Sequence, residues 1–268
     1  MSGTDIHPTA IVDPGARLGT GVSVGPYSII GGNVEVGDGC RLQHHVTLQG
    51  PSTIGSENVF YAFTSIGQQT QDLKYRAEPT YLRVGNGNTF REFVTVHRGT
   101  APESSTCIGS GGNFLAYSHV AHDCGVGDGV IFSNNGTIAG HVEVGDFAVI
   151  GGLTAVHQYC RIGRHAITGG CSKIVQDVPP FMIADGNPAR VRGVNQIGLE
   201  RHGFTEESVR RLREAYRLLY RSKMNVKQAV GEIRTTLWGA PEIEYLVTFI
   251  ESSGRGIIRR HIRGEVEE

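Results

Sequence analysis

The feature of this sequence that most constrains its fold is a hydrophobic repeat with a period of six residues. It is interrupted twice and resumes each time in the same phase. Its members are Ile6, Val12, Leu18, Val24, Ile30, Val36, Leu42, Leu48, Ile54, Phe60, Ile66, Val84, Phe90, Val96, Ile108, Phe114, Val120, Val126, Phe132, Ile138, Val144, Ile150, Val156, Ile162 and Ile174. Thr168 is the one polar residue in the series. Neither an isolated helix nor an open sheet has this period.

A period of six is typical of a hexapeptide β-helix. Each hexapeptide forms one short strand and one corner, and three of them close a triangular coil of about 18 residues. Because side chains alternate along a strand, the aliphatic residue points inward and its neighbours point outward. Residues 18 apart therefore stack on the same edge, about 4.8 Å from each other. The periodicity predicts a mainly β fold and leaves its handedness open, although the usual crossover rule favours a right-handed turn.

This register brings several polar residues to one outer edge. Gly140 lies one coil after His122, and Gln158 lies one coil after Gly140. Asp123 lies in the same way below His141. A histidine, a carboxylate, a glycine N–H and a second imidazole therefore gather at one corner. We interpret them as a candidate base, its orienting group and a backbone hydrogen-bond donor.

Charge and cysteine content exclude several classes of protein. The formal net charge is −1, so the molecule as a whole is not suited to nucleic acid. From Arg190 onward, 15 Lys and Arg face 11 Asp and Glu, a net +4. The five cysteines are odd in number and form no CxxC pair, which favours reduced thiols in the cytoplasm. We expect neither a signal peptide nor a membrane span, since no stretch approaches the length of about 20 apolar residues.

Breaks in the repeat divide the chain. Residues 67–82 are polar and contain a proline, so we expect a loop excursion there, and residues 101–107 predict a plain Ser/Thr-rich loop. The sequence predicts a β-helix over 1–190 and a small α-helical domain over 191–268. In that domain Thr205 is a plausible N-cap, and further helices are expected over 225–237 and 241–252.

Several motifs occur together and in order along the chain. They are Gln71-Asp72-Leu73-Lys74-Tyr75, His97-Arg98-Gly99-Thr100, Ala121-His122-Asp123-Cys124, Gly151 to Gln158, Gly169-Gly170-Cys171-Ser172, Gln176 to Pro180 and Gly203-Phe204-Thr205. With them the sequence resembles the UDP-N-acetylglucosamine 3-O-acyltransferases that open lipid A biosynthesis. The likeness covers essentially the whole chain. A hexapeptide repeat alone indicates little about function, whereas this set of motifs is highly specific.

The resemblance implies a left-handed parallel β-helix, a homotrimer, and active sites in clefts between subunits. The implied donor is a 3-hydroxyacyl group held as a thioester on acyl carrier protein, and the acceptor is the 3-hydroxyl of UDP-N-acetylglucosamine. No cofactor and no metal are implied. By motif, His122 matches the general base, Asp123 its orienting carboxylate and Gly140 the oxyanion donor. By their charge, the cluster Arg161-Ile162-Gly163-Arg164-His165 and the arginines of the predicted helices are candidate contacts for the acidic carrier protein.

The resemblance also implies a set of substrate contacts. Those matched by motif are Asp72, Lys74, His119, His141, Gln158, Asn195 and Arg201, with Arg201 meeting the phosphate. His97 and His157 are weaker matches, because either histidine is also plausible as a packed structural residue. Gly170 matches the position that limits acyl length, and a glycine there leaves room for a long chain.

Three departures from the family pattern leave specific questions open. His202 follows Arg201 where a second arginine is common, and the turn containing Pro188 lacks the usual histidine. Residues 68–70 differ just before the Gln-Asp-Leu-Lys motif, which leaves open whether the sugar carries a 3-hydroxyl or a 3-amino group. Neither the preferred acyl length nor the source organism follows from the sequence.

Two rival functions use the same coil. A related N-acyltransferase has an additional N-terminal domain, whereas the repeat here begins at Ile6. A zinc hydratase of the γ-carbonic-anhydrase type places histidines between subunits, and His119 and His122 suggest such a pair. Zinc needs a third protein ligand with an open position, which the sequence does not identify. A purely structural solenoid would leave the polar loop and the histidine edge without a purpose.

Overall fold

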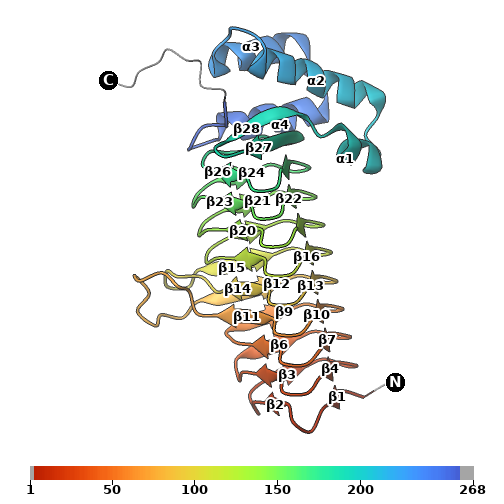
Figure 1. Cartoon of the computed structure of the whole chain (residues 1–268), viewed down its shortest axis with the longest axis vertical. Coiled ribbons are helices and arrows are strands. Elements are labelled where there is room, and N and C mark those ends of the chain that lie inside the picture. The colour runs from red at the N-terminus through yellow and green to blue at the C-terminus, as the bar shows by residue number, and fades with distance from the viewer. Residues whose placement is uncertain (1–2, 260–268) are drawn as a thin grey trace.

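The computed structural model of the protein describes residues 3–259. It is a left-handed parallel β-helix, with a stack of triangular coils at the N-terminal end and helices packed on the last coil (Figure 1). The mainly β class predicted from the period of six is confirmed. The last residues of the predicted helical domain, 260–268, lie outside the described residues.

Three parallel sheets form the sides of the coil, and we refer to them as sheets A, B and C. Sheet A contains β1 (Asp5–Ile6), β4 (Ser23–Val24), β7 (Arg41–Leu42), β10 (Val59–Phe60), β13 (Thr89–Phe90), β16 (Asn113–Phe114), β19 (Ile131–Phe132), β22 (Val149–Ile150), β25 (Ile167–Thr168), β27 (Met182–Gly186) and β28 (Ala189–Val194). Sheet B contains β2 (Ile11–Val12), β5 (Ile29–Ile30), β8 (Thr47–Leu48), β11 (Ser65–Gln68), β14 (Thr95–His97), β17 (His119–Val120), β20 (Thr137–Ile138), β23 (Ala155–Val156) and β26 (Lys173–Ile174). Sheet C contains β3 (Arg17–Leu18), β6 (Val34–Val36), β9 (Ser52–Ile54), β12 (Tyr81–Val84), β15 (Ser105–Ile108), β18 (Gly125–Val126), β21 (Glu143–Val144) and β24 (Arg161–Ile162).

The inward positions form one continuous core along the axis of the coils. From Val24 onward every aliphatic or aromatic member of the repeat is buried, whereas Ile6 is 43% exposed because no coil lies beneath it. Phe90 and Phe114 stack inside the helix with ring centroids 4.8 Å apart. The polar member, Thr168, is also buried, and its hydroxyl accepts a hydrogen bond from the N–H of Gly151 at 2.9 Å. The buried hydroxyl is thereby satisfied.

Three corners connect the sheets in every coil. In the coil that contains β16, β17 and β18, the AB corner is 115–118, the BC corner is 121–124 and the CA corner is 127–130. The BC corner of this coil places Asp123 at a φ of 58°, and the same corner one coil later places His141 at 61°. Left-handed backbone is costly for such residues and turns the chain sharply. The corners therefore present their side chains on the outer edges of the prism.

The two interruptions of the repeat leave the helix at the BC corner. Residues 69–80 protrude from the side of the stack between β11 and β12, as the excursion predicted at 67–82 (Figure 1). The guanidinium of Arg98 is partly buried at its base and donates to the carbonyl oxygens of Gly50 and Gly67. The shorter loop, 98–104, precedes β15 one coil later.

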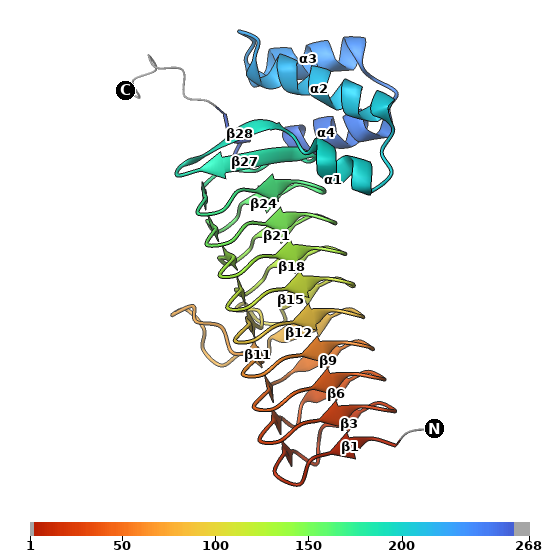
Figure 2. The same ribbon diagram turned by 45° about the vertical axis from the view of Figure 1, so that its right-hand side comes forward.

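The C-terminal helices cover the last coil (Figure 2). They are α1 (Gln196–Arg201), α2 (Glu206–Tyr220), α3 (Val226–Thr236) and α4 (Pro241–Glu251). The predicted N-cap Thr205 is confirmed, since its side chain accepts from the N–H of Ser208. The helices expected over 225–237 and 241–252 are present as α3 and α4. The sequence did not predict α1 or the antiparallel hairpin of β27 and β28, and the proposed division at residue 190 falls inside β28.

The outward faces of the three sheets differ in charge. Outward residues of sheet C include Arg17, Glu35, Arg83, Glu143 and Arg161. Along sheet B the outward column is uncharged from Ile11 to Ala155 and ends at Lys173, if histidine is counted as neutral. Along sheet A it is uncharged from Val59 to Ile167. Charge therefore gathers on one side of the triangular prism.

A column of five aromatic rings follows the AB corner, between the two sheets of low charge. We call it the aromatic ladder, and its members are Tyr27, His45, Phe63, Phe93 and Tyr117. Successive ring centroids lie 4.7 to 5.1 Å apart. Phe63 is 45% exposed and Tyr117 is 55% exposed. The ladder is therefore an apolar edge open to solvent in the single chain. Over residues 3–259, no helix is both long enough and apolar enough to span a membrane.

Candidate active site

The predicted catalytic residues lie on the BC corner immediately after β17. In that strand Val120 points into the core and is fully buried, so the chain turns outward directly after it. His122 and Asp123 follow in the corner, with His141 on the coil above. The imidazoles of His122 and His141 meet edge to face, with ring centroids 5.2 Å apart. The structure thus brings together the residues that the register predicted.

His122 and Asp123 form a closely paired histidine and carboxylate. Nδ1 of His122 lies 2.8 Å from Oδ2 of Asp123, and their side chains are 15% and 8% exposed. An imidazole that donates from Nδ1 keeps its lone pair on Nε2. Within residues 3–259 Nε2 of His122 makes no hydrogen bond. The ring is therefore held by the carboxylate while Nε2 is free to accept a proton.

Gly140 lies directly against the free nitrogen of His122. A Cβ built on Gly140 would be 2.4 Å from Nε2 of His122, so any side chain would displace the ring. The N–H groups on either side of Gly140 are used: Ala139 donates to Val156, and His141 donates to the carbonyl of His122. The N–H of Gly140 donates to no group in the described part of the chain. A candidate base and a residue with an unused backbone donor thus lie against each other.

The Asp123 carboxylate accepts from three groups. Besides His122, the backbone N–H of Thr100 lies 3.1 Å from Oδ2, and the hydroxyl of Ser104 donates to Oδ1. Burial works against ionisation of Asp123, but the hydrogen bonds from Ser104 and His122 outweigh it and hold its pKa below the ordinary value. The Asp123 N–H in turn donates to the hydroxyl of Thr106 at 2.8 Å. The loop that the sequence predicted as a plain connection therefore supports the carboxylate.

Two more of the predicted histidines lie on sheet B beside this corner. The rings of His97 and His119 have centroids 4.8 Å apart, and Nδ1 of His119 lies 2.7 Å from the hydroxyl of Thr95. Burial, with help from the nearby His119 and His122, lowers the pKa of His97 to about 4. Burial and the proximity of His122 also lower the pKa of His119. Both rings are therefore neutral near pH 7 and suited to hydrogen bonding.

Two predicted contacts, His157 and Gln158, continue the BC corner above the pair together with Tyr159. Tyr159 stacks on His141 with centroids 4.6 Å apart. Gln158 is exposed one coil above Gly140, and His157 is exposed beside it, with Nδ1 3.0 Å from the carbonyl oxygen of Gln158. These side chains extend the polar edge in the direction of the C-terminal helices.

The excursion brings Asp72 and Lys74 to the same side of the molecule. Oδ1 of Asp72 accepts from the backbone N–H of Lys74 at 2.9 Å, so the two residues share a turn. The Lys74 side chain is exposed. The turn is anchored by the buried residue Thr70, whose hydroxyl accepts from the Asp72 N–H at 3.0 Å. Lys74 and Asp72 thus project from a fixed base.

The remaining predicted residues lie away from His122 within one chain. Gly170 is exposed on the AB corner, and a Cβ there would meet only the Gly152 carbonyl oxygen, at 3.5 Å. Asn195 is buried, caps the N-terminus of α1 and donates to the carbonyl of His165 on the CA corner. Arg201 is exposed in the last turn of α1. A single chain therefore distributes the predicted site over its three corners.

The histidine cluster and the nearest thiol bear on two other chemistries. Ligand-type atoms of His122, Asp123 and His141 lie within 4.8 Å of one another, close enough to raise the zinc hypothesis again. His141, however, is 3.8 Å from a carboxylate oxygen that His122 already engages through Nδ1. Burial raises the pKa of the Cys124 thiol to about 12, which makes it a poor nucleophile.

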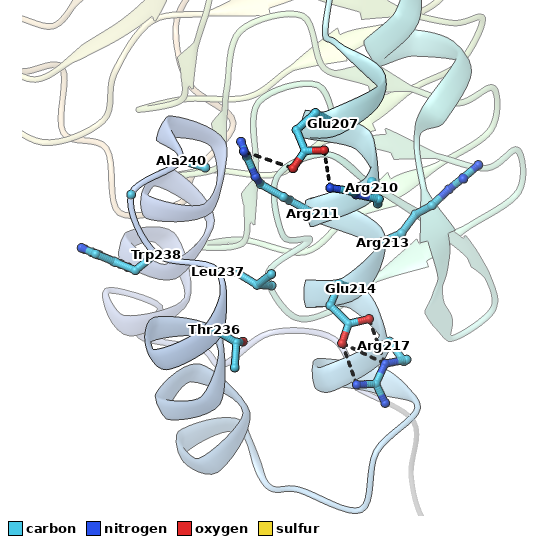
Figure 3. Close-up of a pocket in the computed structure, with 11 residues that line it drawn as sticks. Glu207, Arg210, Arg211, Arg213, Glu214, Arg217, Thr236, Leu237, Trp238 and Ala240 are labelled. Atoms are coloured by element: carbon cyan, nitrogen blue, oxygen red, sulfur yellow. Dashed lines mark hydrogen bonds and ion pairs between the residues drawn. The ribbon is translucent and has the colours of Figure 1, made fainter.

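A groove of about 750 Å³ lies between α2 and the 236–240 loop (Figure 3). Arginines of α2 line one wall and the half-exposed Trp238 lies on the other. Glu207 pairs with Arg210 and Arg211, whereas Arg213 has no carboxylate partner among residues 3–259. The basic cluster expected at 161–165 has partners within the chain. Arg161 pairs with Glu143, and both Arg161 and Arg164 lie over aromatic rings of α4. These two arginines therefore hold the C-terminal helices against the coil.

Comparisons with known proteins agree with the fold. A family model described as UDP N-acetylglucosamine O-acyltransferase, domain 2, matches residues 177–258. An acyl-[acyl-carrier-protein]–UDP-N-acetylglucosamine O-acyltransferase from Thermodesulfovibrio yellowstonii is 49% identical over 256 residues, covering 95% of this chain and 99% of the relative. A solved UDP-N-acetylglucosamine O-acyltransferase from Moraxella catarrhalis is 41% identical with a TM-score of 0.91, covering 95% of this chain and 99% of that one. The acyltransferase from Bacteroides fragilis is 35% identical with a TM-score of 0.92, covering 94% and 99%.

The coil, its histidine–carboxylate corner and these likenesses define an O-acyltransferase of the hexapeptide-repeat class. Within that class the chain belongs to the family of acyl-[acyl-carrier-protein]–UDP-N-acetylglucosamine O-acyltransferases.

Proposed function

We propose that the protein transfers a 3-hydroxyacyl chain from acyl carrier protein to the 3-hydroxyl of UDP-N-acetylglucosamine, as the first step of lipid A biosynthesis in the cytoplasm. The observation that carries the proposal is the free Nε2 of His122, which is backed by Asp123 and lies against Gly140, whose N–H makes no hydrogen bond in the described residues. The names of the relatives supply the substrates, and the geometry supplies the means of joining them.

The proposed reaction begins with a proton transfer. Nε2 of His122 takes the proton of the sugar hydroxyl as its oxygen attacks the thioester carbonyl, because the neutral hydroxyl is a poor nucleophile. Asp123 stabilises the imidazolium that forms. The carbonyl oxygen gains negative charge, which the N–H of Gly140 meets; such a donor contributes about 3 kcal/mol. When the C–S bond breaks, the proton passes from His122 to the departing thiolate. This reaction needs no cofactor and no metal.

The substrate contacts follow from the positions of the other residues. His97, His119 and His141 lie near the base, and we propose that Asp72 and Lys74 contact the substrate from the excursion. The upper BC corner supplies further polar groups, His157 and Gln158. We propose Arg201, in the last turn of α1, for the phosphate, whose charge its planar fork suits. Asn195, which caps the other end of α1, is proposed as a further substrate contact, and Gly170 is proposed for the end of the acyl chain.

We propose a homotrimer in which three copies meet along the aromatic ladder. The ladder is apolar and is flanked by the two sheets of low charge, as expected for a self-association surface. When three triangular coils meet at one corner around a common axis, each copy has a third of the full circle available. The interior angle of a triangular coil is smaller than that, so a wedge-shaped space remains between each pair of copies. Each wedge is walled by sheet B of one copy and sheet A of the next. Such a cleft would unite His122 of one copy with Arg201 of another.

Mixed trimers test this arrangement. His122→Ala and Arg201→Ala chains, each strongly impaired alone, are co-expressed with different tags, and the mixed species are purified. If the two residues serve one site from different copies, the purified mixed trimers should have about a third of the wild-type rate, because each mixed ring contains one intact pair among its three sites. Activity that stays at the level of the single variants would contradict the shared cleft.

We propose that the arginine groove of α2 receives the acidic carrier protein. Arg213 lacks a carboxylate partner in the described residues and projects from the helix (Figure 3). Arg213→Glu should raise KM for the acyl donor several-fold at low salt, with a smaller effect at high salt. Arg83→Glu, on the charged face of sheet C, is the matched control and should leave that KM unchanged. Equal effects of the two variants would remove α2 as the docking surface.

One assay decides the proposed activity. Purified protein is incubated with UDP-N-acetylglucosamine, or its 3-amino analogue, and a panel of 3-hydroxyacyl carrier-protein thioesters. We expect one chain length to give an O-acylated product, and no product from any combination would overturn the proposal. The zinc rival is tested in the same preparation: washing with a chelator should leave the transfer rate unchanged, whereas stoichiometric zinc with hydration of CO2 would replace acyl transfer.

A further inference from the structure

The loop before β15 forms a continuous hydrogen-bonded connection between the excursion and the Asp123 carboxylate. The Asp72 N–H donates to the hydroxyl of Thr70, and the hydroxyl of Thr100 donates to the same oxygen at 2.8 Å. The backbone N–H of Thr100 then reaches Asp123. Ser104, at the other end of this loop, donates its hydroxyl to the opposite carboxylate oxygen. Two segments that leave the coil thus meet at one functional group.

We propose that Ser104, Thr100 and Thr70 are positioning residues of the reaction. Ser104 and Thr100 hold the Asp123 carboxylate in one orientation toward His122. The bond between Thr70 and Thr100 fixes the excursion that carries Asp72 and Lys74 against that same carboxylate. The inference rests on the proposed function, because it concerns how the excursion, with its proposed substrate contacts, and the base are held together.

The arrangement of the carboxylate supports this proposal. Asp123 is in the left-handed region, with a φ of 58°, so the backbone alone does not favour its conformation. Its side chain is 8% exposed, so the hydrogen-bond donors of the protein take the place of the water that would otherwise solvate the carboxylate. With Ser104 on Oδ1 and Thr100 close to both oxygens, rotation of the carboxylate away from His122 would break two bonds.

Removal of the Ser104 hydroxyl should change how the pair titrates. The titratable groups that face Asp123 are His122 on its own corner, His141 on the coil above and the neutral thiol of Cys124; His119 faces His122 from β17. Without Ser104 the negative charge of the carboxylate is less dispersed, so it stabilises the imidazolium more strongly. The acid limb of the pH profile of kcat/KM should then move to higher pH.

Ser104→Ala is the first experiment. We expect kcat to fall about tenfold, as for the loss of one hydrogen bond to a charged group, and the acid limb to move upward in pH. Ser104→Thr, which keeps the hydroxyl, should restore both. Ser110→Ala is the control, since the Ser110 hydroxyl accepts a hydrogen bond from the backbone N–H of Asn86 at a corner of the coil and does not touch Asp123. An unchanged limb with kcat within about twofold of wild type, in a folded protein, would overturn the role of Ser104.

A titration of His122 by NMR gives a readout that needs no turnover. The imidazole of His122 should titrate at higher pH in Ser104→Ala than in wild type or Ser110→Ala. If the wild type transfers no acyl group, the proposed function fails while this titration still decides whether Ser104 acts on the pair. If transfer occurs and the titration does not move, only the positioning inference fails.

Thr70→Val tests the connection to the excursion. The change removes the oxygen shared by Asp72 and Thr100, so KM for the sugar nucleotide should rise about tenfold with a smaller change in kcat. Thr64→Val removes a buried hydroxyl of the same kind from the AB corner and should leave KM unchanged. The double variant Ser104→Ala, Thr70→Val should lose less than the product of the single losses, because both act on the Asp123 carboxylate, Ser104 directly and Thr70 by way of Thr100. Independent effects would show that the excursion and the carboxylate are not linked.

Discussion

Two corners of the β-helix carry histidines in contact with other rings, yet their surroundings differ. On the BC corner, His122 pairs with Asp123 and keeps Nε2 free beside Gly140. On the CA corner, His165 lies between Phe147 and the first helix, is 2% exposed, and its Nδ1 has no hydrogen-bond partner in the described residues. Burial, reinforced by the nearby positive charge of Arg164, lowers the pKa of His165 to about 4.

The difference teaches that a histidine on an outer edge of the β-helix is not by itself a site. Periodicity places both residues on outer edges, and only their neighbours separate a base from a packing residue. At the BC corner a carboxylate fixes the tautomer and a glycine leaves space for a reacting group. At the CA corner aromatic rings and the cap of α1 fill that space, and the ring is held neutral. Substitutions at the BC corner should therefore lower activity, whereas substitutions at the CA corner should lower stability. The opposite result would break the comparison.

The largest effect is expected from His122→Ala. Loss of the base should lower kcat by about a thousandfold, within the usual contribution of a positioned general base. His165→Ala is the matched control: it removes an imidazole from the other corner and should reduce stability while kcat of the folded fraction changes little. The comparison fails if the two variants lose activity equally when corrected for folded protein by circular dichroism.

Gly140→Ala is expected to have the next largest effect. A methyl group 2.4 Å from Nε2 would push the His122 ring away from its position, so kcat should fall by about a hundredfold. The control is Gly125→Ala on β18, where a Cβ meets no atom within 4 Å. Steady-state rates at saturating substrate compare the two variants. A rate near wild type for Gly140→Ala would show that the space beside His122 is not used.

The stacking of the coil could be predicted from the sequence because one physical rule repeats. Inward positions follow the period of six, and the register of 18 residues correctly placed Gly140 against His122 and His141 above Asp123. The contribution of Ser104 to Asp123 could not be predicted, because the path of a loop outside the repeat does not follow from its period. The Ser/Thr content of that loop was the one available signal.

The C-terminal region shows the same limit. Thr205 and the apolar faces of the longer helices indicated α2, α3 and α4, since capping and helical spacing are local signals. The hairpin of β27 and β28 depends on pairing with β25 in the last coil, which is a tertiary contact. Asn195 was predicted as a substrate contact by motif, and the structure shows that it also caps α1. Its role toward substrate stays a prediction.

The smallest effect concerns stability at the CA corner. His165 has a pKa of about 4 when folded, below its ordinary value of 6.5, so the unfolded chain binds the proton more readily. Stability from the neutral ring is therefore complete above pH 6.5 and is lost as the pH falls toward 4. The loss is at most about 3 kcal/mol, and the similarly buried His97 adds its own share.

His165→Phe isolates the contribution of this ring. Phenylalanine can keep the stacking on Phe147 without titrating, so the melting temperature of the variant should fall less than that of wild type between pH 6.5 and pH 4. His97→Phe gives the corresponding test on sheet B. Parallel melting curves of wild type and His165→Phe across this range would mean that His165 is protonated at no cost to the fold. The CA corner would then resemble the BC corner more closely than their neighbours indicate.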